Sequence, residues 1–194
     1  MRTDGTAPAR LRAVLRPVLE AIAGTSGLEY RLVGTAAALA QGVPLHPGDV
    51  DLLLARRDDV DRLAAALSGL PCTLPPTWLA DARQYFARFR VAGTDVEIST
   101  VEWPAGTDTV ECAGPGPWRH YVPVRLGSHV VPAVRLELRL VSELVRRRAD
   151  RYTVLLGHLR AHGADQQLVR RAMRDRQVDP ELQRQVVEHL ARSS

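Results

Sequence analysis

The chain has 194 residues, 45% of them apolar and 25% charged, which is the composition of an ordinary soluble globular protein. This length allows one sizeable core, or one domain with a helical appendage. Residues 1–125 hold 13 arginines and 14 acidic residues, a net charge of −1, and residues 126–194 hold 13 arginines and 8 acidic residues, a net charge of +5. Such a basic half attracts nucleotides, nucleic acid or an acidic partner, or else it is a solvated arginine-rich helical surface.

Two kinds of protein are not expected from this sequence. Cys72 and Cys112 show neither the spacing of metal ligands nor a disulfide framework, which fits a reducing cytoplasm. The first apolar run is interrupted by Arg12, Arg16 and Glu20, and no other stretch reaches eighteen apolar residues, so neither a secretion signal nor a membrane span is expected. We therefore expect a cytoplasmic protein that does not associate with membranes.

The spacing of apolar residues predicts the elements of the first half of the chain. In chain order we expect a helix over residues 9–23, a strand over 30–33, a short helix over 35–41, a strand over 49–54 and a helix over 58–67. Residues 71–83 contain three prolines and are expected to form a loop. A hairpin follows over residues 84–91 and 96–98, then a long loop over 103–119, and then a second hairpin over 121–126 and 129–131.

From residue 134 onward the periodicity becomes helical throughout. The expected helices cover residues 136–145, 152–159, 165–173 and 180–190. The sequence therefore predicts an α/β (α+β) protein with a mixed β-sheet flanked by helices in residues 1–131 and a helical bundle in residues 132–194.

The pattern with the clearest chemical meaning starts where the strand over residues 30–33 ends. Gly34 and Thr35 follow that strand, and the next strand carries Asp49 and Asp51 two residues apart. Because side chains alternate across a strand, both carboxylates point to one face. Neighbouring carboxylates resist joint ionisation unless a cation lies between them, and a glycine turn opening a helix offers N–H groups to a phosphate. The pattern predicts a site for a metal-bound nucleotide.

Glu97 is a further carboxylate, and its apolar neighbours place it in the middle of a later strand. Asp95 shares a face with Glu97 but lies closer to the turn. Glu97 has a second interpretation, in which it forms a cross-strand salt bridge with Arg88 or Arg90.

Together these residues resemble the nucleotidyltransferase superfamily, which has the DNA polymerase β-like fold. The family pattern is an apolar strand, a glycine followed by Gly, Ser or Thr, a short helix, Asp-x-Asp on the next strand and a later carboxylate. In this chain the first elements are Val33-Gly34-Thr35 and Asp49-Val50-Asp51. The resemblance implies a third carboxylate, for which Glu97 is the best match and Asp95 the alternative. The segment Arg147-Arg148-Ala149-Asp150 is also similar to a basic-then-acidic element of many members, in which a basic residue reaches the triphosphate.

This resemblance implies Mg²⁺-dependent transfer of a nucleoside monophosphate from an NTP to a hydroxyl of a small molecule, a protein or an RNA, with release of pyrophosphate. Asp49, Asp51 and Glu97 are then both the catalytic carboxylates and the ligands of one or two Mg²⁺ ions. The residues expected to contact the nucleotide are Gly34, Thr35, Arg56 and Arg148.

Other interpretations of single residues stay open. Thr35 can act as a helix N-cap, and Arg56 and Arg148 can belong to solvated arginine surfaces. Ala36–Ala38 stand where aminoglycoside-modifying members carry an acidic residue, which argues against an antibiotic as acceptor.

Two alternative functions on the same fold also stay open. One is a catalytically inactive module that binds a nucleotide or a partner. The other is a toxin–antitoxin component whose target is a partner protein or a tRNA.

Overall fold

The structure is a computed structural model, and it describes residues 6–103, 106–111 and 119–191. Of the two cysteines, Cys72 is exposed and unpaired, while Cys112 lies outside the described residues. None of the helices in the described ranges combines the length and the apolar character that a membrane span needs.

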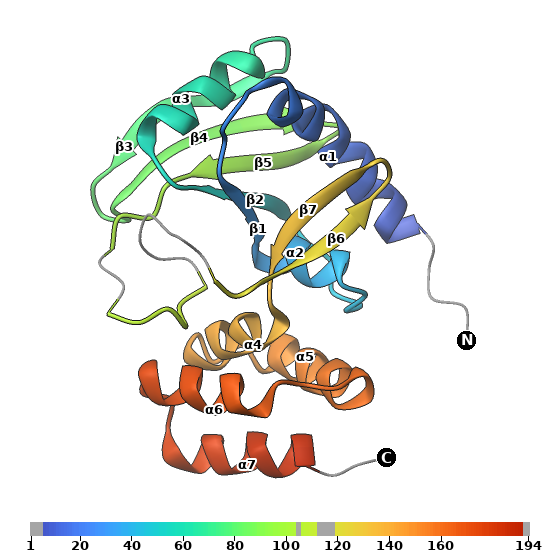
Figure 1. Ribbon diagram of the computed structural model, residues 1–194, viewed down its shortest axis with the longest axis vertical. Coiled ribbons are helices and arrows are strands. Elements are labelled where there is room, and N and C mark those ends of the chain that lie inside the picture. The colour runs from blue at the N-terminus through green and yellow to red at the C-terminus, as the bar shows by residue number, and fades with distance from the viewer. Residues whose placement is uncertain (1–5, 104–105, 112–118, 192–194) are drawn as a thin grey trace.

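A single mixed β-sheet forms the centre of the molecule. Its strands are β1 (Tyr30–Val33), β2 (Asp49–Leu54), β3 (Cys72–Leu79), β4 (Gln84–Val91), β5 (Thr94–Ser99), β6 (Tyr121–Leu126) and β7 (His129–Val134). Across the described ranges their order is β3-β4-β5-β2-β1-β7-β6 (Figure 1). The pairs β1–β7 and β2–β5 are parallel, and the remaining neighbours are antiparallel. The predicted α/β class is confirmed.

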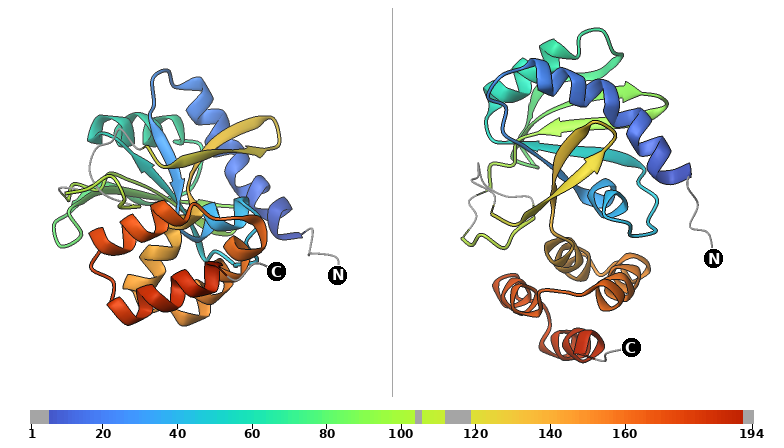
Figure 2. Two further views of the ribbon diagram at one scale, coloured as in Figure 1. Left: turned by 60° about the horizontal axis from the view of Figure 1, so that its bottom comes forward. Right: turned by 45° about the vertical axis from the view of Figure 1, so that its right-hand side comes forward.

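Helices lie around this sheet and below it. They are α1 (Thr6–Gly24), α2 (Gly34–Ala40), α3 (Arg57–Ala66), α4 (Leu136–Val145), α5 (Ala149–His162), α6 (Gln166–Asp175) and α7 (Pro180–Ala191). Figure 1 shows α1 and α3 above the sheet and α2 between the sheet and the C-terminal helices, and Figure 2 shows α4–α7 as a group of their own. The four predicted C-terminal helices are thus present, and the division of the chain at residue 131 stays a prediction.

Strand β2 shows why the sheet has one apolar face and one functional face. Val50, Leu52 and Leu54 are only 1% exposed and belong to the hydrophobic core that the sheet shares with α1 and α3. Asp49 is exposed and Asp51 is partly buried. Alternation along the strand therefore sends the two carboxylates to the face opposite the core residues, as the sequence predicts.

The predicted loop over residues 71–83 is wrong, because most of it is strand β3 at the edge of the sheet. Proline lacks the N–H that a central strand needs, but it is tolerated on an edge strand or at a bulge. The pairing of β3 with β4 shifts register between Leu74 and Thr77, where Pro75 and Pro76 stand. The shift in register thus accommodates Pro75 and Pro76, the two residues that led to the loop prediction.

Candidate active site

Three carboxylates from two neighbouring parallel strands meet on the functional face of the sheet. In the β2–β5 ladder Asp51 lies opposite Glu97, and Asp49 is the next residue of β2 on the same face. One carboxylate oxygen of each of the three residues lies within 4.8 Å of the others. The structure therefore brings together all three carboxylates that the sequence marks as metal ligands.

The electrostatics of this cluster favour a bound cation. Burial, together with the nearby carboxylates of Asp49 and Glu97, raises the pKa of Asp51 to about 7. Burial also raises the pKa of Glu97, while Arg88 acts in the opposite direction. Three oxygen ligands of like charge at this spacing fit a hard divalent ion such as Mg²⁺, which removes the repulsion between them.

Glu97 makes the predicted cross-strand pair and also lies beside the two aspartates. Its Oε1 accepts a hydrogen bond from Nε of Arg88 at 2.9 Å, which is the predicted cross-strand pair. The same side chain still belongs to the cluster with the two aspartates. Asp95, the alternative third acid, instead accepts a hydrogen bond from Arg90 at 2.7 Å and is not part of that group of three.

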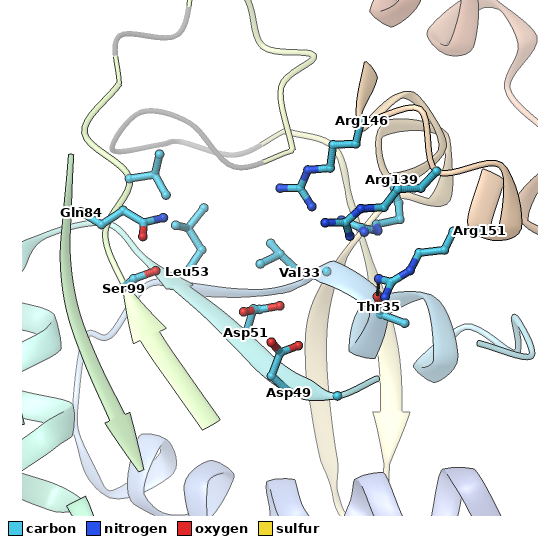
Figure 3. A pocket seen from close by; sticks show the side chains of 14 residues that line it. Val33, Thr35, Asp49, Asp51, Leu53, Gln84, Ser99, Arg139, Arg146 and Arg151 are labelled. Atoms are coloured by element: carbon cyan, nitrogen blue, oxygen red, sulfur yellow. Dashed lines mark hydrogen bonds between the residues drawn. The ribbon is translucent and has the colours of Figure 1, made fainter. Parts of the chain in front are cut away.

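A cavity of about 430 Å³ opens beside the carboxylates. Asp49 and Asp51 lie on one side of it, and Figure 3 shows Arg139, Arg146 and Arg151 on the opposite side. Arg148 also lines this cavity. Since these arginines come from α4, α5 and their connection, the C-terminal helices supply the basic wall that faces the acidic strand.

Gly34 lies directly beside the aspartates, in a conformation that suits glycine. Its φ is +70°, and a Cβ at this position would overlap Oδ2 of Asp51. The N–H of Gly34 donates to Oε1 of Glu111 at 3.0 Å, so a side chain of the protein already occupies this donor.

Thr35 is not the N-cap of α2, and its hydroxyl instead bonds to an arginine beside the cavity. The N-cap of α2 is Val33, so Thr35 lies inside the first turn of that helix. Its Oγ1 accepts a hydrogen bond from Nη1 of Arg151 at 2.8 Å, and the residue lines the cavity.

The two arginines that the sequence assigns to the nucleotide lie in different places. Arg148 lines the cavity. Arg56 is not among the described residues that line it. Its Nε forms a 3.0 Å ion pair with Asp59 at the start of α3, and its side chain is 65% exposed.

Sequence reasoning missed a buried charge cluster behind the cavity wall. Glu111, only 2% exposed, accepts hydrogen bonds from Arg139 at 3.0 and 3.2 Å, and Arg139 forms an ion pair with Glu143 one turn further along α4. Burial raises the pKa of Glu111, but Arg139, Ser142 and the N–H of Gly34 together hold it below its ordinary value. The signal for the helical pair was available, because Arg139 and Glu143 are four residues apart on a mostly apolar helix. Glu111 lies in a loop and carried no such signal.

Comparison with known proteins gives the fold a name. No protein-family model matches the sequence, and no curated protein matches it either. Among solved structures, the chain is similar to TM1012 of Thermotoga maritima, provisionally named a nucleotidyltransferase, with 19% identity over 80% of this chain and 95% of that one and a TM-score of 0.57.

Two further solved structures resemble it less closely. The antibiotic-resistance factor ANT(2'')-Ia is 15% identical over 94% of this chain and 90% of its own, with a TM-score of 0.49. A provisionally named nucleotidyltransferase of H. pylori is 13% identical over 95% of this chain and 82% of its own, also with a TM-score of 0.49. At such identities the likeness concerns the fold alone, and it is the likeness to TM1012 that carries the conclusion. The chain has the nucleotidyltransferase fold.

Proposed function

We propose that the chain is a Mg²⁺-dependent nucleotidyltransferase that moves a nucleoside monophosphate from an NTP to an acceptor hydroxyl and releases pyrophosphate. The observation that supports this most is the group of three converging carboxylates facing a cavity lined by arginines. The acceptor hydroxyl belongs to a small molecule, a protein side chain or an RNA end. The net charge of +5 in residues 126–194 favours an acceptor that itself carries phosphate.

In this proposal the residues divide into two groups. Asp49, Asp51 and Glu97 hold one or two Mg²⁺ ions, which when bound supply neutralisation of the charge that develops on the transferred phosphoryl group. Arg148 and Arg151 bind phosphate oxygens from the opposite side of the cavity. Because Oε1 of Glu97 accepts the hydrogen bond from Arg88, we assign Oε2 to accept the proton of the attacking hydroxyl.

The proposal is tested by measuring pyrophosphate release from each of the four NTPs, with and without Mg²⁺, in the presence of a panel of hydroxyl acceptors that includes RNA. Release that requires Mg²⁺ and one acceptor class supports it. If no NTP yields pyrophosphate with any acceptor, the enzymatic proposal is wrong.

A second candidate is a non-catalytic nucleotide-binding module, and the ion pair between Glu97 and Arg88 favours it. A carboxylate held by arginine is a weaker metal ligand and a weaker base than a free one. Isothermal calorimetry separates the candidates, since this module binds NTP with an affinity that does not depend on Mg²⁺.

Replacing Gly34 by alanine is expected to damage the metal site more than the fold. The left-handed φ costs an alanine about 1 kcal/mol, and the new Cβ also displaces the carboxylate of Asp51. Urea unfolding measures the first effect, and Mg²⁺ binding by calorimetry measures the second.

The matched control for this variant is Gly127→Ala in the turn between β6 and β7. Gly127 has a φ of +65°, and an added Cβ there would meet no atom within 4 Å. Both variants should lose similar stability, and only Gly34→Ala should lose Mg²⁺ binding. Equal Mg²⁺ binding in the two variants would contradict the close approach of Gly34 to Asp51.

Stability without a divalent ion is expected to fall as the pH rises from about 4 to about 7. The raised pKa of Asp51 means that the folded protein retains a proton that the unfolded chain releases in this range, so the free energy of unfolding decreases with pH. At about 1.4 kcal/mol per pKa unit, the decrease is at most about 4 kcal/mol. Urea titrations in EDTA between pH 4 and pH 8 measure it.

Asp51→Asn is the control, because an amide does not titrate. It should flatten the pH dependence and be the more stable protein at pH 8 in EDTA. Mg²⁺ should raise the stability of the wild type at pH 8 and leave that of the variant nearly unchanged. A wild type whose stability is independent of pH over this range would refute the prediction.

A further inference from the structure

Glu143 is a completely buried carboxylate, with an exposed fraction of 0%, in the last turn of α4. Besides its ion pair with Arg139, it lies near two arginines from the start of α5. Its Oε2 is 3.9 Å from Nε of Arg148, and its Oε1 is 3.9 Å from Nη1 of Arg151. One buried anion is therefore shared by three guanidinium groups.

These three guanidinium groups line the cavity that faces Asp49 and Asp51. A separation of 3.9 Å is too long for a hydrogen bond, so charge attraction holds Arg148 and Arg151 near Glu143. The same Nη1 atom of Arg151 that lies near Glu143 also donates a hydrogen bond to Oγ1 of Thr35 at 2.8 Å, which gives this side chain a second anchor. The carboxylate thus restrains long side chains that would otherwise sample many rotamers.

The charge balance of this cluster leaves room for an anion. Arg139 already serves the two buried carboxylates of Glu111 and Glu143. Arg148 and Arg151 have side chains that are 45% and 34% exposed, respectively, so part of each guanidinium group remains open to a ligand. Burying a carboxylate costs free energy even when it is paired, as Glu143 is with Arg139, and this cost is understandable if Glu143 also orients Arg148 and Arg151.

We propose that Glu143 is a positioning residue for the leaving phosphates of the substrate, an inference that rests on the proposed function. It holds Arg148 and Arg151 so that their guanidinium groups meet the β- and γ-phosphates. The reacting α-phosphate must lie at the carboxylates, while Arg151 lies on the opposite side of the cavity (Figure 3) and Arg148 also lines it. The pyrophosphate half of the NTP is thus bound by groups that Glu143 preorganises.

The test measures the dissociation constant of inorganic tripolyphosphate, which carries the phosphate chain without a base or a reaction. Glu143→Gln keeps the shape and removes the charge, and it should weaken tripolyphosphate binding about tenfold, the order expected when charged hydrogen bonds lose their orientation. If Glu143 merely cancelled positive charge, its removal would instead tighten binding. Unchanged or tighter binding therefore overturns the proposal.

The matched control is Glu137→Gln on the same helix. Glu137 is also buried and paired with an arginine, Arg135, which is not among the described residues that line the cavity. It should lose stability comparably and bind tripolyphosphate as the wild type does. A loss of affinity as large as that of Glu143→Gln would show that α4 acts as a whole, against a specific role for Glu143.

If Glu143→Gln does not fold, Glu143→Asp gives the answer, because it keeps the charge and draws it back by one methylene. As a single substitution, Glu143→Asp should weaken tripolyphosphate binding. Added to a variant in which Arg148 and Arg151 are both glutamine, it should have no further effect on that affinity. Wild-type affinity in Glu143→Asp overturns the proposal.

Two results distinguish a failure of the proposed nucleotidyltransferase activity from a failure of the proposed role of Glu143. A wild type that binds tripolyphosphate but releases no pyrophosphate from any NTP contradicts the proposed function and leaves the role of Glu143 intact. A wild type that does not bind tripolyphosphate contradicts the role of Glu143 itself. In an active enzyme, Glu143→Gln should raise the KM for NTP more than it lowers kcat.

Discussion

Asp51→Asn is expected to slow pyrophosphate release by about 10²–10³-fold or more, the usual effect of removing one electrostatic contact to a phosphoryl-transfer transition state. Asp51 lies opposite Glu97 and two residues from Asp49, so an amide there removes one of the three proposed metal ligands. The measurement is the initial rate of pyrophosphate release at saturating Mg²⁺ and NTP. Because the carboxylate of Asp51 is destabilised by burial, the amide should not unfold the protein, and the lost rate can be assigned to chemistry.

Asp95→Asn provides the comparison for this variant. Asp95 lies opposite Asp49 in the ladder of β2 and β5, but its carboxylate is bound to Arg90. This variant should keep a rate close to that of the wild type. If Asp51→Asn were as active as Asp95→Asn, the group of three carboxylates would not be the site of catalysis.

The parts of the fold that could be predicted from sequence are those that local periodicity determines. The alternation in β2 assigns Asp49 and Asp51 to one face without any knowledge of their neighbours. The placement of Glu97 beside them needed one further step, since it depends on β5 pairing with β2 in parallel. The family resemblance implied a carboxylate on a later strand, but the parallel pairing that brings it beside the aspartates was not predicted.

What could not be predicted depends on contacts between residues distant in sequence. Strand β3 was missed because proline marks a loop by local rules, while an edge position with a register shift removes the objection. Glu111 was missed because its partners are 77 residues before it and 28 residues after it in the chain. Arg56 was assigned to the nucleotide. In the structure its side chain pairs with Asp59 of α3, a contact that depends on how the strand end and the helix meet.

The largest loss of stability is expected from replacing Arg139, which links the sheet to the C-terminal helices. Arg139 is 3% exposed and lies between the carboxylates of Glu111 and Glu143, and Glu111 in turn accepts the N–H of Gly34. Arg139→Met should lower the free energy of unfolding by about 3–5 kcal/mol at pH 7, because it leaves two buried carboxylates without their shared cation. Urea unfolding followed by circular dichroism measures the loss.

Arg90→Met separates this effect from the ordinary cost of deleting an ion pair. The pair between Arg90 and Asp95 is solvent-exposed, and such pairs contribute about 1 kcal/mol or less. The loss in Arg139→Met should also shrink as the pH falls, because protonation removes the uncompensated charges of Glu111 and Glu143, while the loss in Arg90→Met should stay small throughout. Equal losses in the two variants would mean that α4 is attached to the sheet by its apolar residues alone, and that the buried charges do not stabilise the fold.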